Sequence, residues 1–220
     1  MKVRFVGGGS LRAFRENYQT EKEELLLFGF EGLGEVSYEK ELKGESSFFE
    51  ETALFSKETK STIVCGCVTN TLGHKRKSAV VAENGKLLGV SDATHVIDGQ
   101  GNAGASLRVY ETKVGRMGVL VAEDLFFPET VKALSLCGSD FLVCVFGKVG
   151  EYSTQNLVRS YAYLYGLPIL FCGIGYSMIA DMGGSIYVAS PQSPLSVNFN
   201  GAKEYHLIQT RRRGKYACLD

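Results

Sequence analysis

The side chains that could carry chemistry are few and lie far apart along the 220-residue chain, which has six cysteines and three histidines. Cys65 and Cys67 alternate, so both thiols would lie on one face of a strand, where a metal ion could use them. The alternative is core packing, and it is favoured because no second cysteine pair or histidine cluster accompanies them. Gly7-Gly8-Gly9-Ser10 lacks the lysine of a phosphate-binding loop and indicates a turn. We therefore expect no metal and no nucleotide cofactor.

Acidic residues follow two apolar runs and are the next candidates. Glu31 ends one run and is either a pocket carboxylate or a salt-bridged structural residue. Glu123 and Asp124 follow the other run, and Asp124 either braces the next turn or contacts a ligand. Glu31 and Glu123 could form an acid–base pair only if the fold brings them together, which their spacing does not determine.

The composition excludes several classes of partner. Hydrophobic residues make up 45% of the chain and the formal net charge is zero, so there is no broad attraction to nucleic acid or an anionic membrane. The run Arg211–Arg213 with Lys215 is typical of a solvated tail. The N-terminus does not resemble a signal peptide, and no apolar run approaches the roughly 20 residues that span a bilayer. We expect a cytoplasmic protein with reduced thiols.

Short apolar runs alternate with amphipathic stretches along the whole chain, which predicts an α/β protein. Asn84-Gly85 favours a type I′ turn between strands at Ser78–Ala82 and Lys86–Val90. A second hairpin is expected around Gly115, so the sheets are mixed rather than purely parallel. The other predicted strands are Lys2–Val6, Leu25–Phe30, Thr62–Thr69, Phe141–Phe146, Ile169–Cys172, Ser185–Ala189 and Glu204–Gln209.

Three helices have recognisable ends. Ser47-x-x-Glu50 has the form of a capping box and predicts a helix behind it. Pro128 predicts the start of a second helix that ends near Cys137-Gly138. Thr154–Tyr165 predicts a third, closed by Gly166. No repeat or linker interrupts the pattern, so residues 1–220 are predicted to form one domain.

Five segments together resemble the nitrilase (carbon–nitrogen hydrolase) superfamily. Residues 115–129, GRMGVLVAEDLFFPE, resemble the strand and turn that carry the family's nucleophile. Residues 78–96 resemble its hairpin and the segment that follows. Weaker similarities, in the same order as in the family, cover residues 25–31, 159–162 and 183–191.

The resemblance implies a four-layer αββα sandwich with mixed β-sheets. It also implies acyl transfer through a cysteine, with a glutamate as general base and a lysine that stabilises the tetrahedral intermediate. Carried onto this chain, the glutamate is Glu31, the lysine position is Ala93 and the cysteine position is Ala122. A methyl group cannot attack a carbonyl or nitrile carbon, so two of the three functional side chains are missing.

Three functions follow from this pattern. The first is a hydrolase homologue that is inactive or impaired and keeps a small-molecule pocket or an interaction role, with Glu123, Phe126 and Phe146 as substrate-binding residues. The second is an active amide or nitrile hydrolase with another nucleophile, for which Cys144 and Cys172 are candidates. The third is a structural partner of another protein, with a pocket closed by aromatic residues such as Phe30.

The resemblance also bears on partners. A small amide, nitrile or carboxylate is the expected ligand, and no cofactor is implied. In the family, the helices here at residues 130–136 and 157–164 pack across a two-fold axis, which predicts a homodimer.

Overall fold

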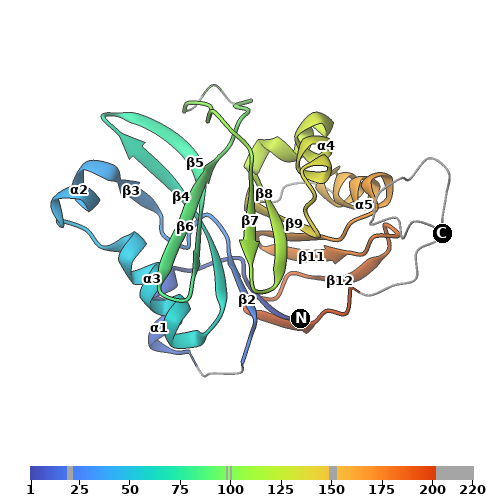
Figure 1. The fold of residues 1–220 in the computed structure, drawn as a ribbon, viewed down its shortest axis with the longest axis horizontal. Helices are drawn as coiled ribbons and strands as arrows, with labels where there is room; N and C mark the ends of the chain where they lie inside the picture. Colours follow the sequence, from blue (N-terminus) through green and yellow to red (C-terminus); the bar gives the residue numbers. More distant parts are fainter. Residues whose placement is uncertain (19–21, 98, 100, 149–152, 202–220) are drawn as a thin grey trace, which may run out of the picture.

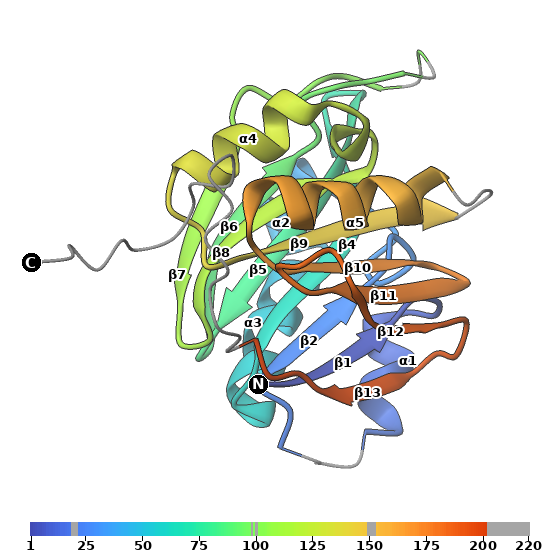
Figure 2. The same cartoon turned by 90° about the vertical axis from the view of Figure 1, so that its right-hand side faces the viewer.

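The computed structural model describes residues 1–18, 22–97, 99, 101–148 and 153–201. Two β-sheets face each other in the middle of the molecule, and helices cover the outer face of each sheet (Figures 1 and 2). The four-layer αββα sandwich with mixed sheets is therefore confirmed. No helix in the described ranges is long and apolar enough to cross a membrane.

The first sheet has the order β13-β1-β2-β4-β5-β6, with β3 paired to β4. Strands β1, β2 and β4 run parallel, whereas β4, β5 and β6 form an antiparallel meander. The predicted turn between β5 and β6 has positive φ at both central residues, +49° at Asn84 and +78° at Gly85. The strands are β1 (Lys2–Val6), β2 (Leu25–Phe28), β3 (Glu35–Ser37), β4 (Thr62–Thr71), β5 (His74–Glu83), β6 (Lys86–Asp92) and β13 (Leu195–Asn198).

The second sheet has the order β12-β11-β10-β9-β8-β7. Its centre, β8, β9 and β10, is parallel, and antiparallel hairpins close both edges. The predicted hairpin around Gly115 is the pair β7 and β8. The strands are β7 (Arg108–Thr112), β8 (Gly115–Val121), β9 (Phe141–Lys148), β10 (Ile169–Ile174), β11 (Tyr176–Ala180) and β12 (Ile186–Ser190). The short 3₁₀ helix η1 (Ala122–Phe126) follows β8 directly.

Alternation of side chains along the strands divides the core into three clusters. One lies between the sheets and contains residues such as Phe5, Val64 and Val143. A second lies between the second sheet and helices α4 and α5, and a third between the first sheet and helices α1 and α3. The helices are α1 (Leu11–Glu16), α2 (Tyr38–Lys43), α3 (Phe48–Thr59), α4 (Pro128–Leu136) and α5 (Ser153–Tyr165).

Several predicted boundaries were wrong. The strand predicted as Leu25–Phe30 ends at Phe28, because the chain turns at Gly29, whose carbonyl accepts a hydrogen bond from the Gly32 N–H at 3.0 Å. A Cβ on Gly29 would lie 2.5 Å from the Gly7 carbonyl oxygen, so only glycine allows this approach. The structure also contains elements that were not predicted, among them α1, α2 and β3. The predicted strand Glu204–Gln209 and the run Arg211–Arg213 lie outside the described residues.

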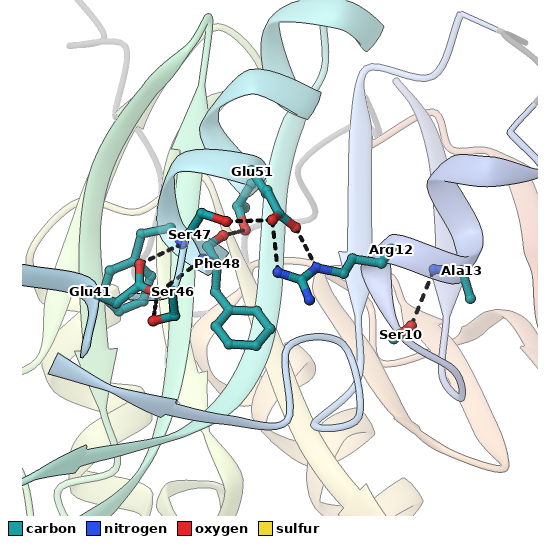
Figure 3. Close-up of polar contacts among 10 residues, drawn as sticks. Ser10, Arg12, Ala13, Glu41, Ser46, Ser47, Phe48 and Glu51 are labelled. Atoms are coloured by element: carbon teal, nitrogen blue, oxygen red, sulfur yellow. Dashed lines mark hydrogen bonds and ion pairs between the residues drawn. The ribbon is translucent and has the colours of Figure 1, made fainter. Parts of the chain in front are cut away.

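The capping box predicted before α3 is not formed as expected. Ser47 donates its hydroxyl hydrogen bond to Glu51 at 2.6 Å rather than engaging Glu50. Glu51 also accepts two hydrogen bonds from the Arg12 guanidinium, at 2.6 and 2.7 Å, so its carboxylate lies between Ser47 and Arg12 of α1 (Figure 3). The first N–H groups of α3 are instead capped by Glu41, which accepts from Phe48 and Phe49 at 3.1 Å each.

The hydrogen bonds from Phe48 and Phe49 to Glu41 should stabilise the start of α3. Glu41→Ala leaves two helix N–H groups without their carboxylate partner, and we expect it to lower the free energy of unfolding by about 1–2 kcal/mol. Glu50→Ala changes an exposed glutamate in the first turn of α3 and is the control, with an expected loss below about 0.5 kcal/mol. Urea denaturation of both variants measures the difference. Equal losses in the two variants would contradict a specific capping role of Glu41.

Candidate functional site

The chain makes a strained turn where β8 ends. Ala122 is the first residue of η1, is 3% exposed and has φ of +49°. An L-residue in the left-handed region costs roughly 1–2 kcal/mol, and such strain is concentrated at functional sites. The turn therefore holds the Ala122 methyl group at a fixed position, and the family resemblance assigns this position to the nucleophile.

A buried carboxylate ties this turn to the segment after β6. Asp124 is 1% exposed and accepts hydrogen bonds from the backbone N–H groups of Thr94 and His95, each at 3.0 Å. It also accepts from the Thr94 hydroxyl at 2.8 Å, and its Oδ1 lies 3.0 Å from His95 Nδ1. The His95 ring stacks on Phe127, with 3.7 Å between the ring centroids. Asp124 thus braces the turn, which is the structural alternative that the sequence left open.

A cavity of about 350 Å³ opens beside Ala122. Its volume is within the range that holds small-molecule ligands. The wall is mostly apolar, and its charged side chains come from β5, η1 and the end of β9. The lining residues are Phe30, Val68, Lys77, Ala122, Glu123, Phe146, Gly147 and Lys148.

An ion pair lies on the cavity wall. The Lys77 ammonium group contacts Glu123 Oε1, and the two side chains are 29% and 16% exposed. Glu123 Oε2 is enclosed by protein and has no hydrogen-bond partner within the described residues. Lys77 lies opposite Ala93, the position that the resemblance assigns to the family's lysine, since the Lys77 carbonyl accepts a hydrogen bond from the Ala93 N–H at 2.8 Å.

The predicted site residues divide into two groups. Ala122, Glu123 and Phe146 line the cavity, whereas Glu31, Ala93 and Phe126 are not among its lining residues. Ala93 is 1% exposed and belongs to the core cluster between the sheets, together with Ala122. Phe126 is 38% exposed and packs edge-on against Phe146, with 5.9 Å between the ring centroids.

Glu31 lies at the turn after β2 and is exposed. Its Oε2 accepts a hydrogen bond from the Gly9 N–H at 3.1 Å, and its neighbour Phe30 is the residue of this turn that lines the cavity. Glu123 contacts Lys77 and Glu31 accepts a hydrogen bond from Gly9, so these contacts do not support an acid–base pair between the two glutamates.

The sequence reasoning missed Lys77 as a lining residue. The Asn84-Gly85 turn fixes the pairing of β5 with β6 near the turn, but a register shift at Val81 moves every later pair by one residue. The shift pairs Ser78 with Asp92, and it brings Lys77 next to Ala93. A β-bulge of this kind has no sequence signal that could have been used here.

The cysteines considered as alternative nucleophiles are buried in the core. Cys144 lies between the second sheet and its helices, and Cys172 lies between the two sheets. Burial raises the pKa of the Cys144 thiol well above its ordinary value and raises the pKa of Cys172 to about 12. A thiolate is the reactive form, so both thiols are unreactive near neutral pH.

Cys65 and Cys67 pack together in the core beneath α1 and α3. Burial also raises the pKa of both thiols. The described residues contain no cluster of three or more histidine, cysteine or acidic side chains that could hold a metal. The burial of both side chains in this cluster accounts for the Cys65-x-Cys67 pattern by packing.

Thiol labelling tests this assignment. In native protein at neutral pH we expect iodoacetamide to label Cys137, which is exposed, and to leave Cys65, Cys67, Cys144 and Cys172 unmodified. Peptide mapping after native and denatured labelling measures each site. Native labelling of Cys144 or Cys172 at a rate near that of Cys137 would contradict the burial of these thiols.

Comparisons with known proteins agree with this architecture. A probable nitrilase of Schizosaccharomyces pombe is 33% identical over 76 residues, which are 33% of this chain and 28% of that protein. This chain thus aligns with under a third of that relative's length.

Solved structures give a longer match. A carbon–nitrogen hydrolase of Helicobacter pylori G27 has a TM-score of 0.71 at 18% identity, with 89% of this chain and 87% of that chain covered. A cysteine-to-alanine mutant of the Nesterenkonia AN1 amidase, from the nitrilase superfamily, has a TM-score of 0.75 at 14% identity, with 89% and 88% covered. At these identities the likeness concerns the fold alone. The model of the carbon–nitrogen hydrolase family matches residues 22–199, and this chain therefore belongs to that family.

Proposed function

We propose that this protein is a carbon–nitrogen hydrolase homologue that does not carry out the family's covalent chemistry and keeps its pocket as a small-molecule binding site. The observation that carries the proposal is Ala122, a methyl group at the strained turn beside the cavity. Loss of a nucleophile lowers turnover by roughly a million-fold in other hydrolases. The cavity is nevertheless open, with about 350 Å³ of space and an ion pair on its wall.

The other two functional positions support the same proposal. Ala93 supplies no ammonium group to stabilise negative charge in a tetrahedral intermediate. Glu31, the proposed remaining base position, is exposed and bonded to Gly9 N–H, while the apolar Phe30 faces the cavity. We propose that Phe30 occupies the space from which a general base would act, so that the general base is lost together with the nucleophile and the lysine.

Ammonia release from a panel of small amides and nitriles tests the proposal. We expect the protein to give no release above the uncatalysed rate, with or without a thiol-blocking reagent. Release that disappears on thiol blocking would overturn the proposal in favour of a hydrolase with another cysteine nucleophile. Release that survives blocking would overturn it in favour of catalysis by a group other than a thiol.

We also propose a cytoplasmic homodimer. Apolar side chains remain exposed on the outer helices, Leu136 at 77% on α4 and Leu164 at 53% on α5, which suits a partner surface. Light scattering of Leu164→Glu should then give a monomer mass where the parent protein gives a dimer. Lys57→Glu, at an exposed charged position of α3 on the outer face of the other sheet, is the control. A monomer in the parent protein would contradict this proposal without affecting the one on catalysis.

A further inference from the structure

The cavity beside Ala122 has a charge balance that selects among possible ligands. Two of its lining residues are lysines, Lys77 and Lys148, and one is a glutamate, Glu123. The lining therefore carries a formal charge of +1. The remaining wall is formed chiefly by Phe30, Val68 and Phe146, which offer only apolar contacts.

The positions of these charged groups increase the excess of positive charge that a ligand in the cavity would meet. Glu123 Oε1 faces the Lys77 ammonium group, and Oε2 is enclosed by protein. The Lys77 side chain is 29% exposed, whereas that of Glu123 is 16% exposed, and Lys148 is an exposed residue. A molecule in the cavity thus meets ammonium groups more readily than the carboxylate. In a partly enclosed site this difference is screened less than at an open surface.

We infer that the cavity binds a small monocarboxylate with an apolar body, the body against the two phenylalanines and the carboxylate towards the lysines. This inference rests on the proposed function, because it takes the same cavity as a binding site. A neutral amide of the same shape gains the apolar contacts but not the charge attraction. An amine of the same shape is repelled by the excess positive charge.

Isothermal titration with a matched series tests the inference. The probes are 3-phenylpropionate, 3-phenylpropanamide and 3-phenylpropylamine, which share one apolar body and differ in charge. We expect the carboxylate to bind on the order of tenfold more tightly than the amide, with two cation contacts contributing a few-fold each. Its affinity should fall as sodium chloride is raised, whereas that of the amide should not.

Two substitutions should act in opposite directions. Lys148→Gln removes one cation and should weaken the carboxylate about threefold. Glu123→Gln removes the carboxylate that contacts Lys77 and should tighten binding of the carboxylate ligand by a similar factor. Neither should change binding of the amide by as much. Lys86→Gln, an exposed lysine on β6 that does not line the cavity, is the control, and thermal unfolding verifies that each variant is folded.

The outcomes separate this inference from the proposal on catalysis. Equal or tighter binding of the amide, or weaker carboxylate binding in Glu123→Gln, would overturn the inference. Those results would leave the loss of covalent chemistry unaffected. Ammonia release from amides by the parent protein would overturn the proposed function. The titration would still test the inference in that case, because the carboxylate would then bind the same cavity as a reaction product.

Discussion

The combined variant Phe30→Glu, Ala93→Lys, Ala122→Cys is expected to release ammonia from a small amide at least about a thousandfold faster than the parent protein. The cysteine supplies the nucleophile, the glutamate takes up its proton, and the lysine stabilises the negative charge that forms on the carbonyl oxygen. The turn that must present the thiol already has the required strained backbone, with φ of +49° at position 122. Ammonia release per mole of folded protein is the measurement.

Two partial variants make this experiment sharper. Phe30→Glu with Ala93→Lys lacks a nucleophile and should remain silent. Ala93→Lys with Ala122→Cys keeps Phe30 and depends on Glu31 as the base. If this double variant equals the triple variant, Glu31 acts as the base and the space beside Phe30 is not where the proton is taken up. Silence of all three folded variants would contradict the proposal that the cavity retains the geometry of a hydrolase site.

Asp124→Ala is expected to lower the free energy of unfolding by about 3–5 kcal/mol, the largest stability effect predicted for the site. The substitution removes the buried acceptor of two backbone N–H groups and of the Thr94 hydroxyl. These donors lie in the segment after β6, so the segment and the turn at Ala122 lose their main connection. Urea denaturation monitored by circular dichroism measures the change.

The conservative substitution separates hydrogen bonding from charge. Asp124→Asn keeps one acceptor oxygen and should cost less than Asp124→Ala, on the order of 2 kcal/mol. Glu129→Ala, an exposed acidic position in the first turn of α4, is the control and should change stability by less than about 0.5 kcal/mol. A loss below about 1 kcal/mol in Asp124→Ala would contradict the role of this carboxylate as the brace of the turn.

Much of the fold could be predicted from local patterns. The Asn84-Gly85 hairpin, the α4 helix that begins at Pro128, and the central strands β4 and β9 all have signals in a few adjacent residues. The α1 and α2 helices were missed because each has only six residues and too little periodicity to recognise. Their N-termini are capped by Ser10 and Ser37, but a single serine is too common to predict a helix.

Three of the residues predicted for the site, Ala122, Glu123 and Phe146, line the cavity. Ala122 and Glu123 belong to the segment that resembles the family's nucleophile turn, whereas Phe146 lies outside the five resembling segments. Phe30 and Glu31 are adjacent, and which of the two lines the cavity depends on where β2 ends. The end of a strand is its least predictable property. The placement of Lys77 at the cavity depends on the register shift between β5 and β6, and that of Lys148 depends on the length of β9. Tertiary packing sets both.

Mass spectrometry with peptide mapping, after treatment with an electrophilic amide analogue such as acrylamide, tests whether the site has lost its nucleophile. The parent protein is incubated with the analogue under native conditions, and the same is done with Ala122→Cys. We expect no adduct at any residue that lines the cavity of the parent protein. In the variant we expect an adduct at position 122, in addition to any at the exposed Cys137 that both proteins share. An adduct on the parent protein that maps to Lys77, Cys144 or Cys172 would contradict the claim that the site has lost its nucleophile.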